Sequence, residues 1–163
     1  MGASPTIPRK NPPGGLLFIL GAAVGLVGCG GEPVPASPPV PAAPVVVTET
    51  PAFDGARALE EVRRFVELGA RDAGTPGAER GALWIRDRLE TLGIPARLDR
   101  FPDDTPRGTS EFRNVLAELP GATADWIVLG AHYDTKAGIF PFEGANDSGS
   151  GVGVLIELAR ILR

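Results

Sequence analysis

Prolines are distributed unevenly along this chain of 163 residues, and the imbalance limits where a packed domain can form. Eleven of the 17 prolines lie within residues 1–51, and seven of these lie within residues 30–51. A segment this rich in proline favours extended polyproline conformations and cannot bury a hydrophobic core. We therefore predict that residues 29–52 are a linker and that the folded domain spans residues 53–163.

The residues before the linker have the pattern of an export signal. Arg9 and Lys10 precede an apolar run over residues 16–27, which leads into Gly28 and Cys29. A positive segment before an apolar run of roughly 7–15 residues is typical of a secretory signal peptide, whereas a membrane-spanning helix needs about 20 apolar residues. The end of the run resembles the processing signal of bacterial lipoproteins, in which the cysteine is lipidated and becomes the new N-terminus.

This resemblance predicts a lipoprotein signal peptide over residues 1–28 and a lipid anchor at Cys29, with the membrane as a partner. The protein would then be exported and held in the bacterial cell envelope. Gly30 is not the acidic residue that retains some lipoproteins in the inner membrane, which favours the outer membrane or the periplasmic face in a Gram-negative host. The alternative is an ordinary signal peptide followed by an unmodified Cys29.

Composition excludes several kinds of site. The chain has one cysteine and one histidine, so it has no intramolecular disulfide and no cysteine-based zinc site, and residues of this chain cannot form a multi-histidine metal site. Its formal net charge is −4, whereas a nucleic-acid-binding domain normally carries a basic surplus, so we expect no nucleic-acid partner.

Three segments have the periodicity of amphipathic helices. The first follows Asp54, a residue suited to the N-cap, and the second begins at Thr75-Pro76, with proline in the first helical turn. Gly93 and Pro95 end the second helix. The third, residues 152–162, has a wide apolar face and should be mostly covered. The expected buried stripes of the first two are Leu59, Val62, Phe65 and Val66, and Ala82, Ile85, Leu89 and Leu92.

Strand patterns alternate with these helices. Alternating residues predict a strand over 94–101, followed by a loop over 102–108 and a second strand over 112–119. The nearly unbroken apolar run 126–131 is typical of a central strand that is buried on both faces. Helices interleaved with strands predict the α/β class.

The residues that could bind a metal or take part in catalysis follow that last strand. In an α/β sheet, ligands bind beyond the C-terminal ends of strands. His132 and Asp134 are two residues apart on an extended segment, so they share a side, and Asp134 can accept the ring N–H of His132. Asp147 follows in the loop before the last helix and can place a carboxylate next to His132. A neutral imidazole and a carboxylate are suitable ligands for Zn²⁺.

Two segments resemble the N-terminal motifs of the co-catalytic zinc aminopeptidases and their relatives, the glutaminyl-peptide cyclotransferases. They are Ala131-His132-Tyr133-Asp134-Thr135-Lys136 and Gly144-Ala145-Asn146-Asp147-Ser148-Gly149-Ser150-Gly151. The resemblance covers residues 53–163 and implies the N-terminal part of a zinc peptidase domain. The implied fold is an α/β three-layer sandwich with a central mixed sheet, truncated at its C-terminus.

The resemblance also implies roles for individual residues. His132 and Asp147 would be metal ligands, Asp134 would orient His132, and the bond between Asp147 and Ser148 would be cis. The implied activity is zinc-dependent aminopeptidase hydrolysis of peptides, with two zinc ions. The alternative is a glutaminyl cyclase with one zinc, which forms N-terminal pyroglutamate. Asp147-Ser148 and the segment His132-Tyr133-Asp134-Thr135-Lys136 favour the cyclases, whereas Gly149-Ser150-Gly151 favours the aminopeptidases.

The resemblance places the catalytic glutamate that acts as general base, and the remaining metal ligands, beyond the last helix. We therefore expect this chain to be an incomplete copy that binds zinc weakly and turns over nothing, and a non-catalytic lipoprotein fragment remains an alternative. At the level of single residues, His132 can be an ordinary surface or core histidine, and Asp147 can be only the N-cap of the last helix. The loop lacks the G-x-S-x-G and G-x-G-x-x-G spacings of serine hydrolases and dinucleotide-binding proteins.

Overall fold

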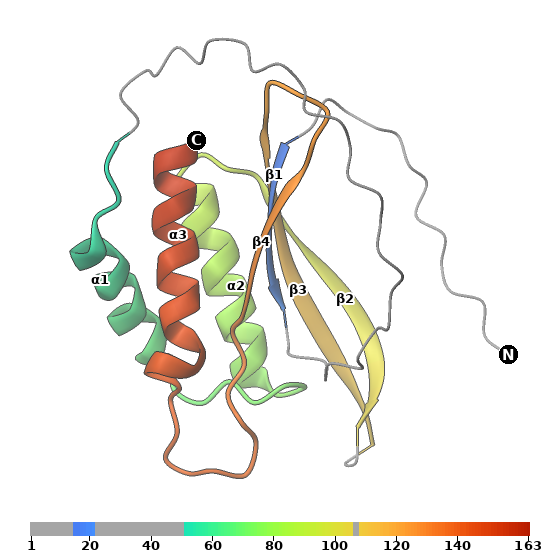
Figure 1. Ribbon diagram of the computed structural model, residues 1–163. Coiled ribbons are helices and arrows are strands. Elements are labelled where there is room, and N and C mark those ends of the chain that lie inside the picture. The colour runs from blue at the N-terminus through green and yellow to red at the C-terminus, as the bar shows by residue number, and fades with distance from the viewer. Residues whose placement is uncertain (1–14, 22–50, 106–107) are drawn as a thin grey trace, which may run out of the picture.

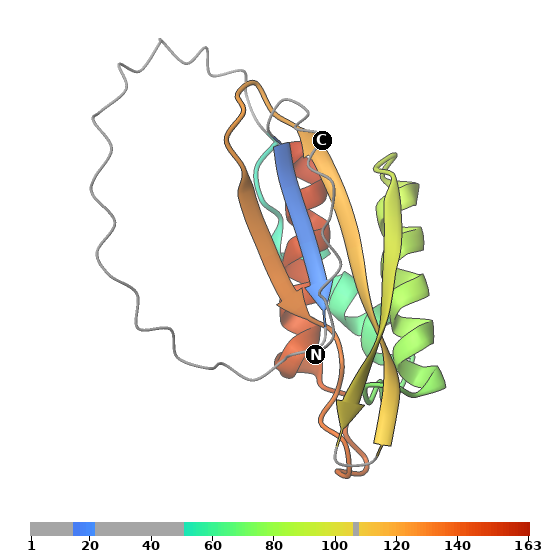
Figure 2. The ribbon, with the colours of Figure 1, turned by 90° about the vertical axis from the view of Figure 1, so that its right-hand side faces the viewer.

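The computed structural model describes residues 15–21, 51–105 and 108–163. Within these ranges, the helices lie together on one face of a four-stranded sheet (Figures 1 and 2). The mixture of helices with parallel and antiparallel strands confirms the α/β class. The described residues supply two layers of the expected sandwich. The elements in chain order are β1 (Gly15–Gly21), α1 (Gly55–Val66), α2 (Pro76–Thr91), β2 (Ala96–Thr105), β3 (Gly108–Pro120), β4 (Ile127–His132), the irregular segment η1 (Ala145–Gly149) and α3 (Ser150–Leu162).

The predicted N-caps of the first two helices are confirmed. The carboxylate of Asp54 accepts hydrogen bonds from the backbone N–H groups of Ala56 and Arg57, at 2.9 and 3.2 Å. The hydroxyl of Thr75 accepts from the N–H of Ala78, and Pro76 occupies the first turn of α2. Each cap satisfies backbone donors that the helix itself leaves unpaired.

The core lies between the helices and the sheet. It is built mainly from α2, β3 and α3, and Phe65, Ile85, Val115 and Val152 are fully buried in it. The prediction that Leu59 belongs to the buried stripe of α1 is wrong, because its side chain is 50% exposed. The buried positions of α1 are Ala58, Val62 and Phe65, which recur at helical spacing and turn Leu59 away from the core.

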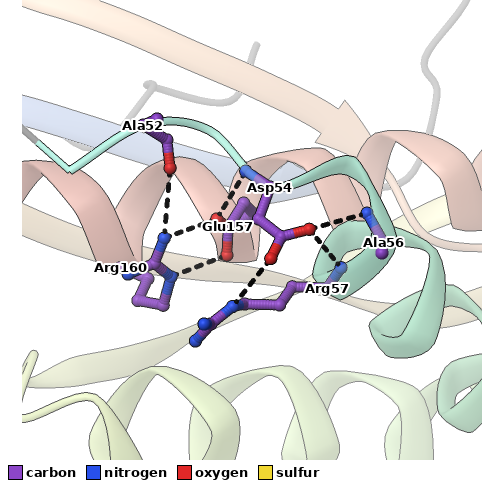
Figure 3. Close-up of polar contacts among 6 residues, drawn as sticks. All are labelled: Ala52, Asp54, Ala56, Arg57, Glu157 and Arg160. Atoms are coloured by element: carbon purple, nitrogen blue, oxygen red, sulfur yellow. Dashed lines mark hydrogen bonds and ion pairs between the residues drawn. The ribbon is translucent and has the colours of Figure 1, made fainter.

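A buried acid ties the start of α1 to α3. Glu157 of α3 is 2% exposed, and its carboxylate accepts hydrogen bonds from the guanidinium of Arg160 and from the backbone N–H of Asp54 (Figure 3). Arg160 also reaches the carbonyl of Ala52 at 3.5 Å. The hydrogen bonds from Arg160 and Asp54 hold the pKa of Glu157 below its ordinary value, against the opposing effect of burial.

The sheet has the strand order β2-β3-β1-β4. Strands β2 and β3 form a long antiparallel hairpin, with pairing from Ala96 opposite Ala117 to Thr105 opposite Gly108. The predicted loop over 102–108 is therefore wrong, because β2 continues to Thr105 and β3 already begins at Gly108, before the predicted start at residue 112. Pro102 is tolerated there because β2 is an edge strand of the described sheet, where a missing N–H breaks no pairing with a further strand.

Strand β4 lies at the other edge of the described sheet. The prediction that residues 126–131 are buried on both faces is wrong, since Ile127 and Val128 are 66% and 56% exposed. The described helices cover only one face of the sheet, as Figure 2 shows, and Val128 points to the uncovered face. Ile127 is on the same face as Ala131, which lies against Gly151 of α3, but it is at the start of an edge strand and is exposed there.

Strand β1 coincides with part of the segment predicted to be a signal peptide. Gly15–Gly21 pairs antiparallel with β3 and parallel with β4, so it lies between these two strands. Cys29 and nearly all of the proposed linker lie outside the described residues. No helix in the described ranges is long and apolar enough to cross a membrane.

Candidate metal site

The single histidine lies where the sheet ends. His132 is the last residue of β4, and the chain leaves the sheet there as an irregular segment. Its side chain is 37% exposed, so one side of the imidazole faces solvent. This is the C-terminal edge of a strand that is parallel to its neighbour β1, as the sequence predicts for a ligand-binding position.

Asp147 comes to the same edge from the segment η1. It has extended backbone angles (φ −109°, ψ 92°) within an otherwise helical segment, and its bond to Ser148 is cis, as the resemblance predicts. Gly144 begins the segment with a positive φ of 57°. A Cβ at this position would lie 2.4 Å from the carbonyl oxygen of Asp147, so only glycine allows the chain to fold back this closely.

The imidazole of His132 lies between two carboxylates. Its Nε2 is 2.9 Å from Oδ1 of Asp147, and its Nδ1 is 3.3 Å from Oδ1 of Asp134. The structure thus brings together all three side chains that the sequence analysis selected. The alternative in which Asp147 only caps the last helix does not hold, because the N-cap of α3 is Gly149 and no side chain caps that end.

The pair fits a zinc ion in donor type and in spacing. Zinc binds histidine nitrogen and carboxylate oxygen at about 2.0–2.2 Å, so two ligands of one tetrahedral ion lie about 3.3 Å apart. The Nε2–Oδ1 separation of 2.9 Å is close to this value. However, no group of three or more His, Cys, Asp or Glu side chains that could hold a metal occurs in the ranges that the structure describes. These residues therefore supply two ligands and leave the rest of a coordination sphere open.

A buried arginine behind the site was not found from the sequence. Arg71, in the loop between α1 and α2, is fully buried, with its guanidinium 4.2 Å from the ring centroid of Phe65. It donates to the carbonyl oxygens of Gly69, Tyr133 and Glu143 at 2.6, 3.0 and 2.7 Å. Burial lowers the pKa of Arg71, and the negative charges of Asp134 and Glu143 oppose that effect.

Tyr133 and Thr135 also anchor the segment that follows His132. The Tyr133 hydroxyl donates to the carbonyl of Arg113 at 2.9 Å, and burial raises the pKa of Tyr133 to about 12. The hydroxyl of Thr135 accepts from the N–H of Arg71 at 2.8 Å and donates to the carboxylate of Asp72 at 2.7 Å. The only sequence signal for these roles is that both residues alternate with His132 and Asp134, so they point to the opposite side of an extended segment.

Comparison with known proteins gives a consistent set of relatives. Residues 114–163 match Peptidase family M28. A glutaminyl-peptide cyclotransferase-like protein from Bos taurus is 37% identical over 100 residues, which are 58% of this chain and 26% of that protein. The chain thus spans about a quarter of the length of this relative.

Solved structures agree with this result. A glutaminyl cyclase from an Acidobacteriales bacterium has a TM-score of 0.65 and 33% identity, over 76% of this chain and 44% of that one. A leucine aminopeptidase precursor from Bacteroides thetaiotaomicron has a TM-score of 0.63 and 28% identity, over 70% of this chain and 43% of that one. The predicted zinc-exopeptidase-like fold is confirmed. In sequence and fold, this chain is similar to aminopeptidases and glutaminyl cyclases, and its residues 114–163 match Peptidase family M28.

Proposed function

We propose that His132 and Asp147 are ligands of a catalytic zinc ion, and that the whole protein is a zinc-dependent exopeptidase of the aminopeptidase type. The observation that carries this proposal is the 2.9 Å approach of His132 Nε2 to Asp147 Oδ1 at the end of β4. The similarity to a leucine aminopeptidase precursor supports the reaction type. The substrate would be a peptide whose N-terminal residue is released.

The chain's own residues would prepare the metal ligands. Asp134 lies on the Nδ1 side of the imidazole, with Oδ1 3.3 Å from Nδ1, so its negative charge favours a proton on Nδ1 and would leave the Nε2 lone pair free for the ion. Asp147 supplies an anionic oxygen on the other side, and its 69% exposed side chain leaves room for a substrate or a second metal. When bound, zinc would polarise the substrate carbonyl and lower the pKa of a bound water toward about 7.

The comparisons favour a second candidate to a similar degree. A glutaminyl cyclase is among the solved structures that match, and a cyclotransferase-like protein is among the sequence relatives. In this reaction the α-amine of an N-terminal glutamine attacks its own side-chain amide carbon, the ring closes and ammonia leaves. The same two ligands would then hold one zinc ion in place of two.

Zinc binding tests the proposal on the 163-residue chain itself. Because His132 is the only histidine of the chain, we expect weak binding of one zinc ion that is reduced about tenfold or more by His132→Ala and by Asp147→Asn. Asp125→Asn, an exposed change in the turn before β4, is the matched control and should bind like the wild type. Binding that is equal in all four proteins would contradict the proposal.

Two product assays separate the candidate reactions. Release of p-nitroaniline from an amino-acid p-nitroanilide indicates an aminopeptidase, and release of ammonia from a glutaminyl peptide indicates a cyclase. We expect neither product from the 163-residue chain, because its described residues offer only two ligands. Turnover by this chain together with tight stoichiometric zinc would contradict that expectation. If no zinc binds at all, the proposed metal site is wrong.

We also propose that the protein is exported and anchored in the cell envelope through a lipid on Cys29. The support is the order of a positive segment, an apolar run and the only cysteine of the chain. A Cys29→Ala variant expressed in a bacterial host should leave the membrane fraction. Retention of that variant in the membrane fraction would exclude the lipid anchor.

A further inference from the structure

We propose that Arg71 is a positioning residue that sets the separation of His132 and Asp147, and so the metal affinity of the site. This inference rests on the proposed zinc site and adds a residue to it. Arg71 does not touch the two ligands. It acts through the backbone on either side of the loop that joins them.

The hydrogen bonds of Arg71 reach both ligand-bearing segments. Nε donates to the carbonyl of Tyr133, the residue between His132 and Asp134, at 3.0 Å. Nη2 donates to the carbonyl of Glu143, four residues before Asp147, at 2.7 Å. One planar guanidinium therefore fixes the distance between the end of β4 and the start of η1. Its five donors in a rigid fork suit this task, because they hold several acceptors in one fixed geometry.

Arg71 is itself held from two further directions. Nη1 donates to the carbonyl of Gly69 at 2.6 Å, which closes the local loop after α1. Its backbone N–H donates to Thr135 Oγ1 at 2.8 Å, and its carbonyl accepts from the N–H of Thr135 at 3.3 Å. The junction formed by Arg71, Tyr133, Thr135 and Glu143 thus connects three loops through hydrogen bonds inside the protein.

The burial of the charged guanidinium of Arg71 is unusual and indicates a specific role. A full charge inside a protein costs free energy unless its donors are satisfied, and neutral hydrophobic packing often gives equal or better stability. Arg71 is fully buried, and its guanidinium donates to backbone carbonyls of three separate loop positions. A residue that served stability alone would not need to reach both sides of the 136–143 loop.

The test uses two matched arginine-to-lysine changes. Arg71→Lys keeps the charge and the aliphatic stem, but a single ammonium cannot span the carbonyls of Tyr133 and Glu143. Arg88→Lys is the control, because Arg88 pairs with Glu61 and links α2 to α1 away from the site. We expect Arg71→Lys to weaken zinc binding about tenfold, in the range seen when residues that orient metal ligands are changed. Arg88→Lys should leave the zinc affinity unchanged, whatever it does to the unfolding midpoint.

Amide hydrogen exchange on the zinc-free chain gives a readout that needs no metal. Arg71→Lys should raise the exchange rates of the Thr135 and Gly149 amides, which bond to Arg71 and Gly144, while the β2–β3 hairpin keeps its protection. Thr135→Val, which removes the side-chain acceptor of Arg71, should have a smaller effect of the same kind. If Arg71→Lys does not fold, Thr135→Val carries the test alone.

The outcomes separate this inference from the proposed function. If the wild type binds zinc at His132 and the folded Arg71→Lys and Thr135→Val variants bind it equally well, the positioning role is wrong and the zinc site stands. If the wild type binds no zinc, the proposed function fails. The exchange rates at Thr135 and Gly149 then decide the role of Arg71 by themselves, because unchanged rates would overturn it.

Discussion

The Arg71 junction and strand β1 both connect parts of the chain that are distant in sequence, but they draw on different regions of it. The junction uses residues 69–72, 133–135 and 143, all within the predicted domain. Strand β1 uses Gly15–Gly21, which has the pattern of the apolar core of a signal peptide. The loops behind the site are therefore held by the domain itself, whereas the pairing of β4, which ends at His132, depends on a segment that processing would remove.

Removal of residues 1–28 should give the largest effect and tests this contrast. Strands β3 and β4 would lose their common neighbour, so we expect the free energy of unfolding to fall by several kcal/mol, because a full ladder of hydrogen bonds is lost on both sides of β1. Urea unfolding measures this loss. The amides of β4 should exchange quickly, while the Thr135 and Gly149 amides stay protected.

A deletion of residues 1–14 is the matched control, because it keeps β1. It should unfold at the same urea concentration as the full chain. If the longer deletion is as stable as the shorter one, β1 contributes nothing to the sheet in solution and the contrast between the two regions disappears.

Helix α2 packs against the loop that contains Arg71, and we expect substitutions in it to have the next largest effect on the free energy of unfolding. A Cβ on Gly77 would lie 2.1 Å from the carbonyl oxygen of Ala70, which is backbone and cannot yield easily. A Cβ on Gly81 would meet the side chain of Arg71 at 2.9 Å. We expect Gly77→Ala to cost about 2–3 kcal/mol of unfolding free energy, in the range of other overpacked sites.

Gly81→Ala should cost less than Gly77→Ala, since a side chain can shift and alanine favours the helix by about 1 kcal/mol over glycine. Thermal unfolding of the two variants side by side measures the difference. An equal cost for both would show that the close approach of α2 to the Arg71 loop is not maintained in solution.

The buried acid of α3 should make stability depend on pH. The folded pKa of Glu157 lies below its ordinary value, so its contribution is present above about pH 4.3, the ordinary value, and is lost as the pH falls through the folded pKa. Glu157→Gln should therefore destabilise the protein at pH 7 by about 2 kcal/mol, the scale of a hydrogen bond to a charged group, and less in acid. Glu118→Gln, a change at an exposed position, is the control and should leave the stability unchanged at both pH values. A difference between wild type and Glu157→Gln that stays constant from pH 7 to pH 3 would contradict this account.

The smallest effect is expected on the face of the sheet that the described helices leave open. Val128→Thr should change the free energy of unfolding by less than about 0.5 kcal/mol, as for other exposed positions. The matched change Val115→Thr places a hydroxyl in the core and should cost about 1–3 kcal/mol. Comparable losses in urea unfolding would show that Val128 is covered in solution.

The sequence predicted the local features of the fold better than its long-range ones. The N-caps at Asp54 and Thr75 and the stripe of Ala82, Ile85 and Leu89 follow from local chemistry, and the structure confirms them. The predicted burial of β4 was wrong because burial depends on which elements cover the sheet. The sequence of residues 126–131 carries no information about those elements. The predicted length of β2 was too short because Pro102 indicates a loop unless the strand is known to lie at the edge of the sheet.

The candidate site shows the same division. The alternation of His132 and Asp134 on an extended segment predicted a shared side, and the motif resemblance brought Asp147 to the same edge, as the structure does. Arg71 was missed because arginine is rarely buried, and its loop offers no periodicity from which burial could be inferred. Its role is visible only when the carbonyls of Tyr133 and Glu143 are seen to lie on either side of it.

The most direct test of the zinc site is the imidazole signal of His132, the only histidine in the chain. In ¹⁵N-labelled protein, long-range ¹H–¹⁵N correlation spectra distinguish Nδ1 from Nε2. We expect the proton on Nδ1, facing Asp134, and a zinc-dependent shift of Nε2 that Asp147→Asn greatly reduces. An Nε2 resonance that does not respond to zinc, or that responds equally in Asp147→Asn, would contradict a shared metal ion at His132 and Asp147.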